Sequence, residues 1–473
     1  MIFERTVTTV SEVIDNFLRR KGLRNENSAW SLGESPLGEI GVFANRDIAC
    51  GEEVFRDYPV IDGPRIKPTD FLFCVVCCKH NDAQLCAKKC GLPVCSNVCY
   101  QKHQSECELI RNKRGNVDEI DRELFQNLTP LRCLSLGDDD RAVIAQLKHH
   151  KGSKHGIEVD KLKDIGLCFE EKEEDYIRLV CCVMDANAFE VLIETDVKEA
   201  NFRGLYPLAG LVNHSCVPNL THAFDQNKVM MVRASVPIRK GQELFHSYVR
   251  LIWSTPTRQF NLAKTKHFTC KCPRCLDPTE FGTYMSGILC KKCRGNVLPQ
   301  NPLTIKSNWV CEDCGTEVAK QEVANLICAL GSVLRSFDDE DLETMLKFLH
   351  LKLARLVHAN HEIAVDLKYR IVWIIGHHEK YKLRDIESQL LDLKSRICEE
   401  LLNLMENLKL GDNKMKGLLS YEMFISLKEK YRRSTLSKTN FPDKSITQQA
   451  EKYFKEACSI LREEVNFPNV VSI

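Results

Sequence analysis

The spacing of the cysteine residues constrains the fold of this chain more strongly than any other feature. The chain has 473 residues, and 24 of them are cysteine. No run approaches the roughly 18 apolar residues of a membrane span, and the charged N-terminal segment lacks the apolar block of a secretory leader. We therefore expect a soluble protein of the nucleus and cytoplasm, where thiols stay reduced and bind metal rather than form disulfides.

Residues 74–107 hold four closely spaced pairs of potential zinc ligands. Eight ligands suffice for two tetrahedral zinc ions. A segment this short has little apolar core, so the metals would supply most of its folding free energy, roughly 10 kcal/mol or more per site. A cysteine-rich segment without metal is the less favoured alternative. In chain order the pairs are Cys74 and Cys77, Cys86 and Cys90, Cys95 and Cys99, and His103 and Cys107.

Two later CxxC pairs have the spacing of a zinc ribbon. Cys290 and Cys293 form the first pair, and Cys311 and Cys314 form the second pair after seventeen intervening residues. A redox role would need a βαβ context that this short stretch lacks, so structural zinc is favoured. Because all four ligands are thiolates, the ion would be closed to water and would not be catalytic.

A third group of ligands joins distant parts of the chain. Cys270, Cys272 and Cys275 form a triplet, and Cys216 lies more than fifty residues upstream of it. An ion shared by these four thiolates would clamp the turn at residues 213–216 against the later segment. The pattern therefore predicts a fourth structural zinc ion, which would hold residues 213–216 and the triplet together as the walls of one site.

Two motifs beside these ligands carry the resemblance to a known family. GLYPLAGLVNHSC occupies residues 204–216, and GQELFHSY occupies residues 241–248. Together with the triplet they resemble the SET domain of protein lysine methyltransferases. The eight-ligand segment is similar to a MYND finger, so the whole resembles the SMYD family, in which such a finger splits the SET domain. The additional ribbon is similar to the arthropod SmydA subgroup.

The resemblance implies an α+β fold in which a β-rich SET domain is split by the finger. It also implies interleaved pairs in the finger, so that Cys74, Cys77, Cys95 and Cys99 hold one zinc and Cys86, Cys90, His103 and Cys107 hold the other. Apolar residues at helical spacing after Val318 predict an α-helical, TPR-like C-terminal domain. The expected segments are an N-terminal helix and first SET part at 1–73, the MYND finger at 74–107, a helical SET insertion at 108–200, the SET core at 201–250, the post-SET zinc segment at 251–277, the ribbon at 278–318 and the helical domain at 319–473.

The resemblance also assigns a methyl-transfer site. Tyr248 corresponds to the family's catalytic tyrosine, and Phe189 to a wall of the channel for the substrate lysine. The implied cofactors are S-adenosylmethionine and four structural zinc ions. The implied cofactor-binding residues are Ile40, Gly41, Asn187, Asn213, His214, Tyr248 and Phe268.

The chain departs from the family pattern at two positions of this site. Glu39 stands where a GxG pair has its first glycine, and Lys266 stands where the pattern YxFxC has its tyrosine. Two readings therefore stay open. The leading one is a lysine methyltransferase that acts on a histone or non-histone protein. The alternative is a catalytically weak scaffold or transcriptional regulator that recruits proline-containing peptides through the finger.

Charge argues against direct nucleic-acid binding. The formal net charge is +1, and fifteen ligand thiolates with four zinc ions would bring it to about −6. We expect a monomer that meets protein substrates and no membrane. The cysteines outside the ligand groups are expected to be small buried apolar residues. They are Cys50, Cys78, Cys133, Cys168, Cys181, Cys182, Cys328, Cys398 and Cys458.

Overall fold

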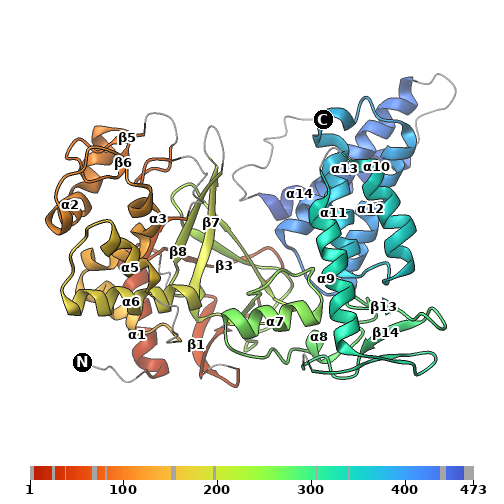
Figure 1. Ribbon diagram of the computed structural model, residues 1–473, viewed down its shortest axis with the longest axis horizontal. Coiled ribbons are helices and arrows are strands. Elements are labelled where there is room, and N and C mark those ends of the chain that lie inside the picture. The colour runs from red at the N-terminus through yellow and green to blue at the C-terminus, as the bar shows by residue number, and fades with distance from the viewer. Residues whose placement is uncertain are drawn as a thin grey trace.

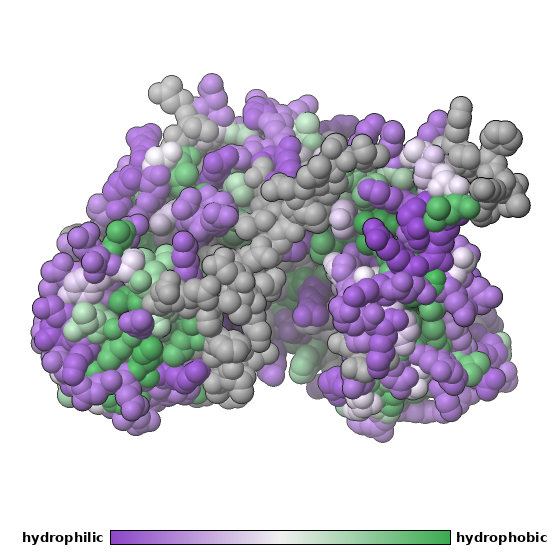
Figure 2. All heavy atoms as spheres, turned by 90° about the horizontal axis from the view of Figure 1, so that it is seen from above, coloured by the Kyte–Doolittle hydropathy of each residue, from purple (hydrophilic) through white to green (hydrophobic). Residues whose placement is uncertain are grey.

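The protein folds into two lobes that are joined at one end (Figure 1). The computed structural model describes residues 5–23, 27–37, 39–65, 72–79, 83–150, 156–194, 199–304, 306–338, 341–436 and 444–462. The first lobe holds the strands expected of a SET domain, and the second is helical. Seen from above, a hollow separates the two lobes (Figure 2). None of the helices in these ranges has the length and apolar content to cross a bilayer.

The first lobe is built from several small sheets rather than one large sheet. Three are antiparallel, in the strand orders β1-β2, β10-β11-β3 and β4-β8-β7, and β9 pairs with β12 in parallel. The parallel pair brings residues 213–214 beside residues 245–246, which come 32 positions later in the chain. The strands are β1 (Trp30–Ser35), β2 (Glu39–Ala44), β3 (Glu53–Asp57), β4 (Ile61–Pro64), β7 (Ala188–Glu194), β8 (Glu199–Leu205), β9 (Asn213–His214), β10 (Leu220–Phe224), β11 (Met230–Ala234) and β12 (Phe245–His246).

Helices and the finger cover one side of these sheets. The finger has the short hairpin β5 (Gln84–Leu85) and β6 (Pro93–Val94), followed by α2 (Asn97–Arg114). The Ser96 side chain accepts a hydrogen bond from the Cys99 amide and so caps the start of α2. The other helices are α1 (Val7–Arg20), α3 (Arg122–Leu131), η1 (Arg132–Ser135), α4 (Asp138–Ala145), α5 (Ile157–Asp164), α6 (Glu171–Asn187) and η2 (Ala209–Leu211).

The second lobe begins with the ribbon and continues as packed helices, as the helical spacing predicts. The ribbon is a four-stranded antiparallel sheet of β13 (Ile288–Leu289), β14 (Asn296–Pro299), β15 (Trp309–Cys311) and β16 (Glu317–Val318). The linking helices α7 (Thr255–Thr265) and α8 (Pro273–Leu276) precede it. The helices that follow are α9 (Lys320–Ser336), α10 (Leu342–Lys347), η3 (Phe348–Lys352), η4 (Leu353–Arg355), α11 (Glu362–His377), η5 (Glu379–Tyr381), α12 (Ser388–Asn407), α13 (Lys414–Leu436) and α14 (Lys444–Leu461).

Each lobe has its own apolar core, and a smaller third core surrounds Cys216 between them. The expectation that every cysteine outside the ligand groups is buried is wrong for Cys50, Cys168 and Cys328, which are exposed. Cys168 lies in the irregular segment between α5 and α6, and Cys328 lies on an exposed face of α9. A thiol group is small, so its exposure at either position leaves little apolar surface in contact with water.

Candidate functional site

The predicted zinc ligands form four clusters in space, with the memberships expected from the sequence. Within each cluster the ligand atoms lie within 4.8 Å of one another. A zinc ion about 2.3 Å from each sulfur of a tetrahedron places the sulfurs about 3.8 Å apart. Neighbouring sulfur atoms are close to that spacing, from 3.3 Å for Cys77 and Cys95 to 3.9 Å for Cys216 and Cys270. The residues present therefore fit four zinc ions.

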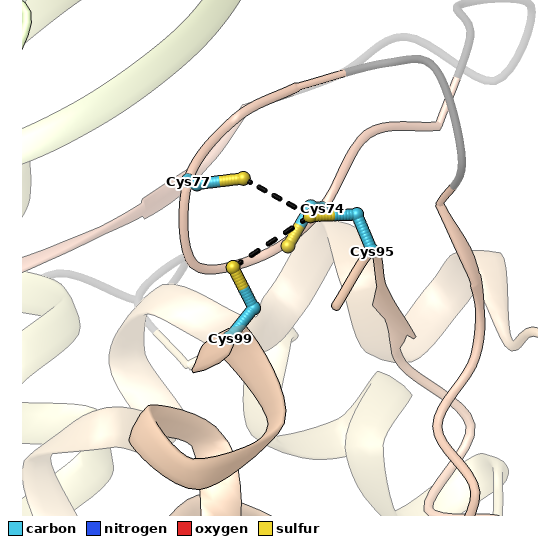
Figure 3. Close-up of side chains that lie close together, drawn as sticks. All are labelled: Cys74, Cys77, Cys95 and Cys99. Atoms are coloured by element: carbon cyan, nitrogen blue, oxygen red, sulfur yellow. Dashed lines mark hydrogen bonds between the residues drawn. The ribbon is translucent and has the colours of Figure 1, made fainter. Parts of the chain in front are cut away.

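The first finger cluster joins a loop to the start of α2. Figure 3 shows the side chains of Cys74, Cys77, Cys95 and Cys99 pointing toward one another. The Cys77 and Cys95 sulfurs are 3.3 Å apart, and those of Cys95 and Cys99 are 3.6 Å apart. The interleaved pairing expected from the family resemblance is thus the one that the fold produces.

The second finger cluster carries a support that the sequence did not reveal. The His103 ring places Nε2 3.2 Å from the Cys90 sulfur and directs Nδ1 to the Glu106 carboxylate at 2.8 Å. Arg132, in η1, donates to the same carboxylate. Burial alone would raise the pKa of Glu106, but the charge of Arg132 and the bond from His103 lower it to about 2. The carboxylate therefore fixes the ring orientation that a zinc ion needs.

The third cluster closes the predicted methyl-transfer site. The Cys216 sulfur lies 3.9 Å from that of Cys270 and 3.5 Å from that of Cys275. Arg258, which is fully buried in α7, points Nη2 at the Cys275 sulfur over 3.5 Å. A guanidinium at this position offsets part of the negative charge that four thiolates around one zinc carry. The post-SET segment is thereby held against the turn at Cys216.

A cavity of about 630 Å³ opens beside this third cluster. Its walls come from the start of β2, the end of α6, the β9 segment, the chain after β12 and the post-SET segment. Six of the predicted cofactor-binding residues line it: Ile40, Asn187, Asn213, His214, Tyr248 and Phe268. The seventh, Gly41, is not among the residues that line the cavity, although its neighbour Ile40 is. The structure therefore brings together residues from five separate segments of the chain.

Gly41 and Asn213 meet at a carboxylate that the sequence did not single out. Asn213 Nδ2 donates to Glu243 Oε1 at 2.7 Å and to the Ile40 carbonyl at 3.2 Å. A Cβ atom at residue 41 would lie 2.3 Å from the same carboxylate oxygen and 3.0 Å from the Ser35 Cβ. The glycine is thus required for a close approach of β2 to Glu243.

His214 and Tyr248 are fixed by hydrogen bonds that also define their protonation. The Tyr248 amide donates to His214 Nδ1 at 2.9 Å, so this nitrogen carries no proton. The His214 Nε2 faces the Cys216 sulfur at 3.3 Å. Burial lowers the pKa of His214 to about 4, and burial raises the pKa of Tyr248 well above its usual range. The site therefore presents a neutral imidazole and a neutral phenol.

Lys266, which replaces the family's tyrosine, lies on the cavity wall. Its Nζ donates to the carbonyls of Ala186 at 2.6 Å and Asp185 at 3.3 Å, at the C-terminal end of α6. The same nitrogen is 5.5 Å from the centre of the Tyr248 ring. The other departure, Glu39, begins β2, and its side chain lies outside the described residues.

Phe268 and Phe189 have different surroundings. Phe268 lines the cavity, is 37% exposed, and places its ring 5.8 Å from the ring of His214. Phe189 does not line this cavity; its ring instead packs against Tyr206, His222 and His246 at 5.5 to 6.0 Å. Tyr206 directly follows β8, His222 lies on β10 and His246 lies on β12. Neither histidine was assigned a role from the sequence. The assignment of Phe189 to a substrate channel stays a prediction.

Comparison with known proteins places this geometry in a family. A model of the SET domain matches residues 66–249. The SET domain-containing protein SmydA-8, isoform B, of Drosophila melanogaster is 32% identical over 85% of this chain and 92% of its own length. The chain belongs to the SMYD family, in its SmydA group. The predicted resemblance is thus confirmed, and so is the predicted class of fold.

Two enzymes of this wider family are more distant. Histone-lysine N-methyltransferase ASHR1 of Arabidopsis thaliana is 26% identical over 64% of this chain and 68% of its own length. N-lysine methyltransferase SMYD2 of Bos taurus is 29% identical over 27% of this chain and 26% of its own length. The similarity to SmydA-8 covers most of this chain and so includes part of the helical lobe. The similarity to SMYD2 covers only about a quarter of this chain.

Proposed function

We propose that this chain is an S-adenosylmethionine-dependent protein lysine methyltransferase. The observation that carries the proposal is the cavity of about 630 Å³ beside the third zinc cluster. It gathers Asn213, His214, Tyr248 and Phe268 on one surface, as a SET-domain methyl-transfer site requires. Membership of the SMYD family supports the same reaction.

The cavity residues can be given separate tasks. Asn213 and His214 are rigid, since both side chains are held by hydrogen bonds, and they can present backbone and ring edges to the cofactor. The ring of Phe268 can stack on the adenine of the cofactor, and the zinc cluster beside Phe268 holds the ring in place. Bound S-adenosylmethionine would supply an electrophilic methyl group.

Tyr248 can align the reacting groups without taking or giving a proton. Its hydroxyl already donates to the Val212 carbonyl at 2.6 Å, so only its lone pairs face the reacting groups. Transfer to an amine is an in-line displacement, for which alignment and exclusion of water are the chief requirements. The substrate lysine must lose its proton, and desolvation near positive charge lowers the pKa of an ammonium. A protein base is therefore unnecessary.

The finer assignments are proposals of the same kind. We propose that the substrate is a lysine of a histone or another protein, that the chain is a monomer, and that it works in the nucleus and cytoplasm. The finger would bind proline-containing peptides. Direct binding to nucleic acid is not expected, because the zinc-loaded chain would be acidic.

One observation favours the alternative of an inactive scaffold. Lys266 occupies the position of a family tyrosine and turns its ammonium toward α6. A chain that has lost this aromatic wall could keep its four zinc ions and its fold without transferring methyl groups.

Calorimetry with S-adenosylmethionine and S-adenosylhomocysteine separates the two readings. The proposal expects one binding site per chain, and methylation of lysine in a panel of histones and protein arrays, read by mass spectrometry. Asn213→Ala is expected to weaken cofactor binding at least about tenfold, because it removes the two hydrogen bonds by which this side chain fixes the cavity wall to Glu243 and to the Ile40 carbonyl. Asn227→Ala, in the turn between β10 and β11, is the matched control. Absence of binding to the zinc-loaded wild-type chain would overturn the proposal.

A further inference from the structure

The charge lining the cavity is unusual for a pocket that takes a cationic cofactor. Besides Lys266, the cationic side chains on its walls are Arg5, Lys148 and Lys271. No aspartate or glutamate lines it among the residues that the structure describes. The anionic groups on the wall are thiolates of the third zinc cluster, and Arg258 already lies against that cluster. The cationic side chains on the wall therefore disfavour the binding of a positively charged ligand.

Lys266 is the cation best placed to act on the reacting centre. Its Nζ is 5.5 Å from the Tyr248 ring centre, whereas Lys271 lies on the exposed side of the triplet. Two carbonyls at the end of α6 hold the ammonium in this position. The partial negative charge at the C-terminal end of α6 stabilises the ammonium of Lys266. The Asp185 carboxylate also attracts this ammonium, but it is half exposed, so solvent screens the attraction.

Partial burial makes the charge of Lys266 effective over this distance. The side chain is half-buried, and burial lowers the pKa of its ammonium. Coulomb energies between charges a few ångströms apart grow as the surroundings become less polar. A sulfonium placed in the same cavity would therefore experience repulsion that a neutral thioether would not.

We propose that Lys266 determines the selectivity of this cavity for the charge on the cofactor sulfur. It weakens binding of cationic S-adenosylmethionine relative to neutral S-adenosylhomocysteine. The inference rests on the proposed function, since it assumes that the cavity binds this cofactor. The two ligands differ by one methyl group and one positive charge, so the effect of charge is read from the change in their affinity ratio between variants that keep and variants that lose the charge at residue 266.

The consequence for the reaction is strong inhibition by its own product. Lys266 favours the state in which the methyl group has left, because the sulfur is then neutral. The chain would turn over slowly unless a hydrolytic reaction removed S-adenosylhomocysteine. A tyrosine at residue 266 would carry no such charge, so the sensitivity depends on the lysine of this chain.

The test compares two dissociation constants by calorimetry for each of four zinc-loaded full-length proteins. In Lys266→Met, the ratio of the Kd for S-adenosylmethionine to the Kd for S-adenosylhomocysteine is expected to fall about tenfold. In Lys266→Arg, which keeps the charge, the ratio stays within about twofold of wild type. Lys264→Met, two residues away on α7 and outside the cavity, is the matched control and leaves the ratio unchanged.

The outcomes separate this inference from the proposed function. If wild type binds both ligands and Lys266→Met leaves their ratio unchanged, the inference fails and the proposed function stands. If Lys266→Arg shifts the ratio as much as Lys266→Met does, packing rather than charge is responsible, and the inference fails again. If wild type binds neither ligand, the proposed function itself fails. Zinc content and thermal unfolding establish that each variant is folded before binding is measured.

Discussion

The hydroxyl of Tyr248 donates a hydrogen bond to the backbone carbonyl of Val212 over 2.6 Å, across the turn that carries Asn213. The bond fixes the ring against the β9 segment and occupies the only proton of the phenol. Because burial also raises the pKa of Tyr248, the group stays protonated at any pH at which the chain is folded and active. Tyr248 is thus a fixed, neutral oxygen rather than an acid or a base.

Replacing Tyr248 with phenylalanine tests that role. We expect Tyr248→Phe to lower methyl transfer by about 100-fold, because the oxygen that aligns the reacting groups is lost. Affinity for S-adenosylhomocysteine should stay within about threefold, since the ring remains. Single-turnover transfer and calorimetry measure the two effects, and Tyr431→Phe in α13 is the control. Undiminished transfer by Tyr248→Phe would remove the residue from the mechanism.

The contact between Gly41 and Glu243 leads to a second prediction. Gly41→Ala would place a methyl group 2.3 Å from Glu243 Oε1 and displace the acceptor of the Asn213 side chain. We expect cofactor affinity to fall about tenfold, because Asn213 loses its orientation. Gly137→Ala, whose added carbon meets no atom within 4 Å, is the control.

A conservative change at Glu243 sharpens this test. Glu243→Gln keeps an oxygen that can accept from Asn213 Nδ2, so calorimetry should give an affinity close to that of wild type. An affinity loss in Glu243→Gln as large as that in Gly41→Ala would mean that the negative charge, and not the hydrogen bond, is what matters.

The four ligand clusters predict a metal content of four zinc ions per chain. Cys293→Ser should leave three ions, because the ribbon loses one of its four thiolates. Cys328→Ser, at an exposed cysteine outside the clusters, should leave four. Mass spectrometry of the metal after gel filtration measures the content. Three ions in wild type, or four in Cys293→Ser, would contradict the ribbon assignment.

The ligands could be predicted because zinc sites are encoded by short, local spacings. The two ligands of each pair are close in sequence, whereas the interleaving of the pairs in the finger was assigned through the family resemblance, which also supported the joining of Cys216 to its cluster. The helical character of the second lobe was also predictable, because apolar residues at helical spacing such as Val323 and Leu330 become buried in its core.

The supports of the site were not predictable from the sequence. Glu106 and Arg132 are 26 residues apart, and Asn213 and Glu243 are 30 residues apart. Glu106 and Arg132 have no motif around them and look like ordinary surface residues until the fold brings them together. Glu243 and Asn213 lie in the two quoted motifs, but neither motif shows that their side chains meet. The burial of Arg258 was hidden for the same reason.

Arg258, Glu280 and Arg274 form a fully buried ionic triad between the post-SET segment and the ribbon. Both guanidinium groups donate to Glu280 Oε2, at 2.7 Å and 2.9 Å, and all three side chains are 0% exposed. Burial alone would raise the pKa of Glu280, but the two arginines lower it, so the carboxylate is charged. The triad therefore holds two cations that the surrounding apolar core could not otherwise accept.

Removing the negative charge should be costly at this position. We expect Glu280→Gln to lower the free energy of unfolding by about 3–5 kcal/mol, because two buried guanidinium groups lose their counter-charge. The control is Glu322→Gln, whose ion pair with Lys291 is exposed on both sides and should contribute less than about 1 kcal/mol. Denaturant unfolding measures both values. Equal losses in the two variants would show that the triad is no stronger than a surface pair, and that the junction between the lobes is stabilised by apolar packing instead.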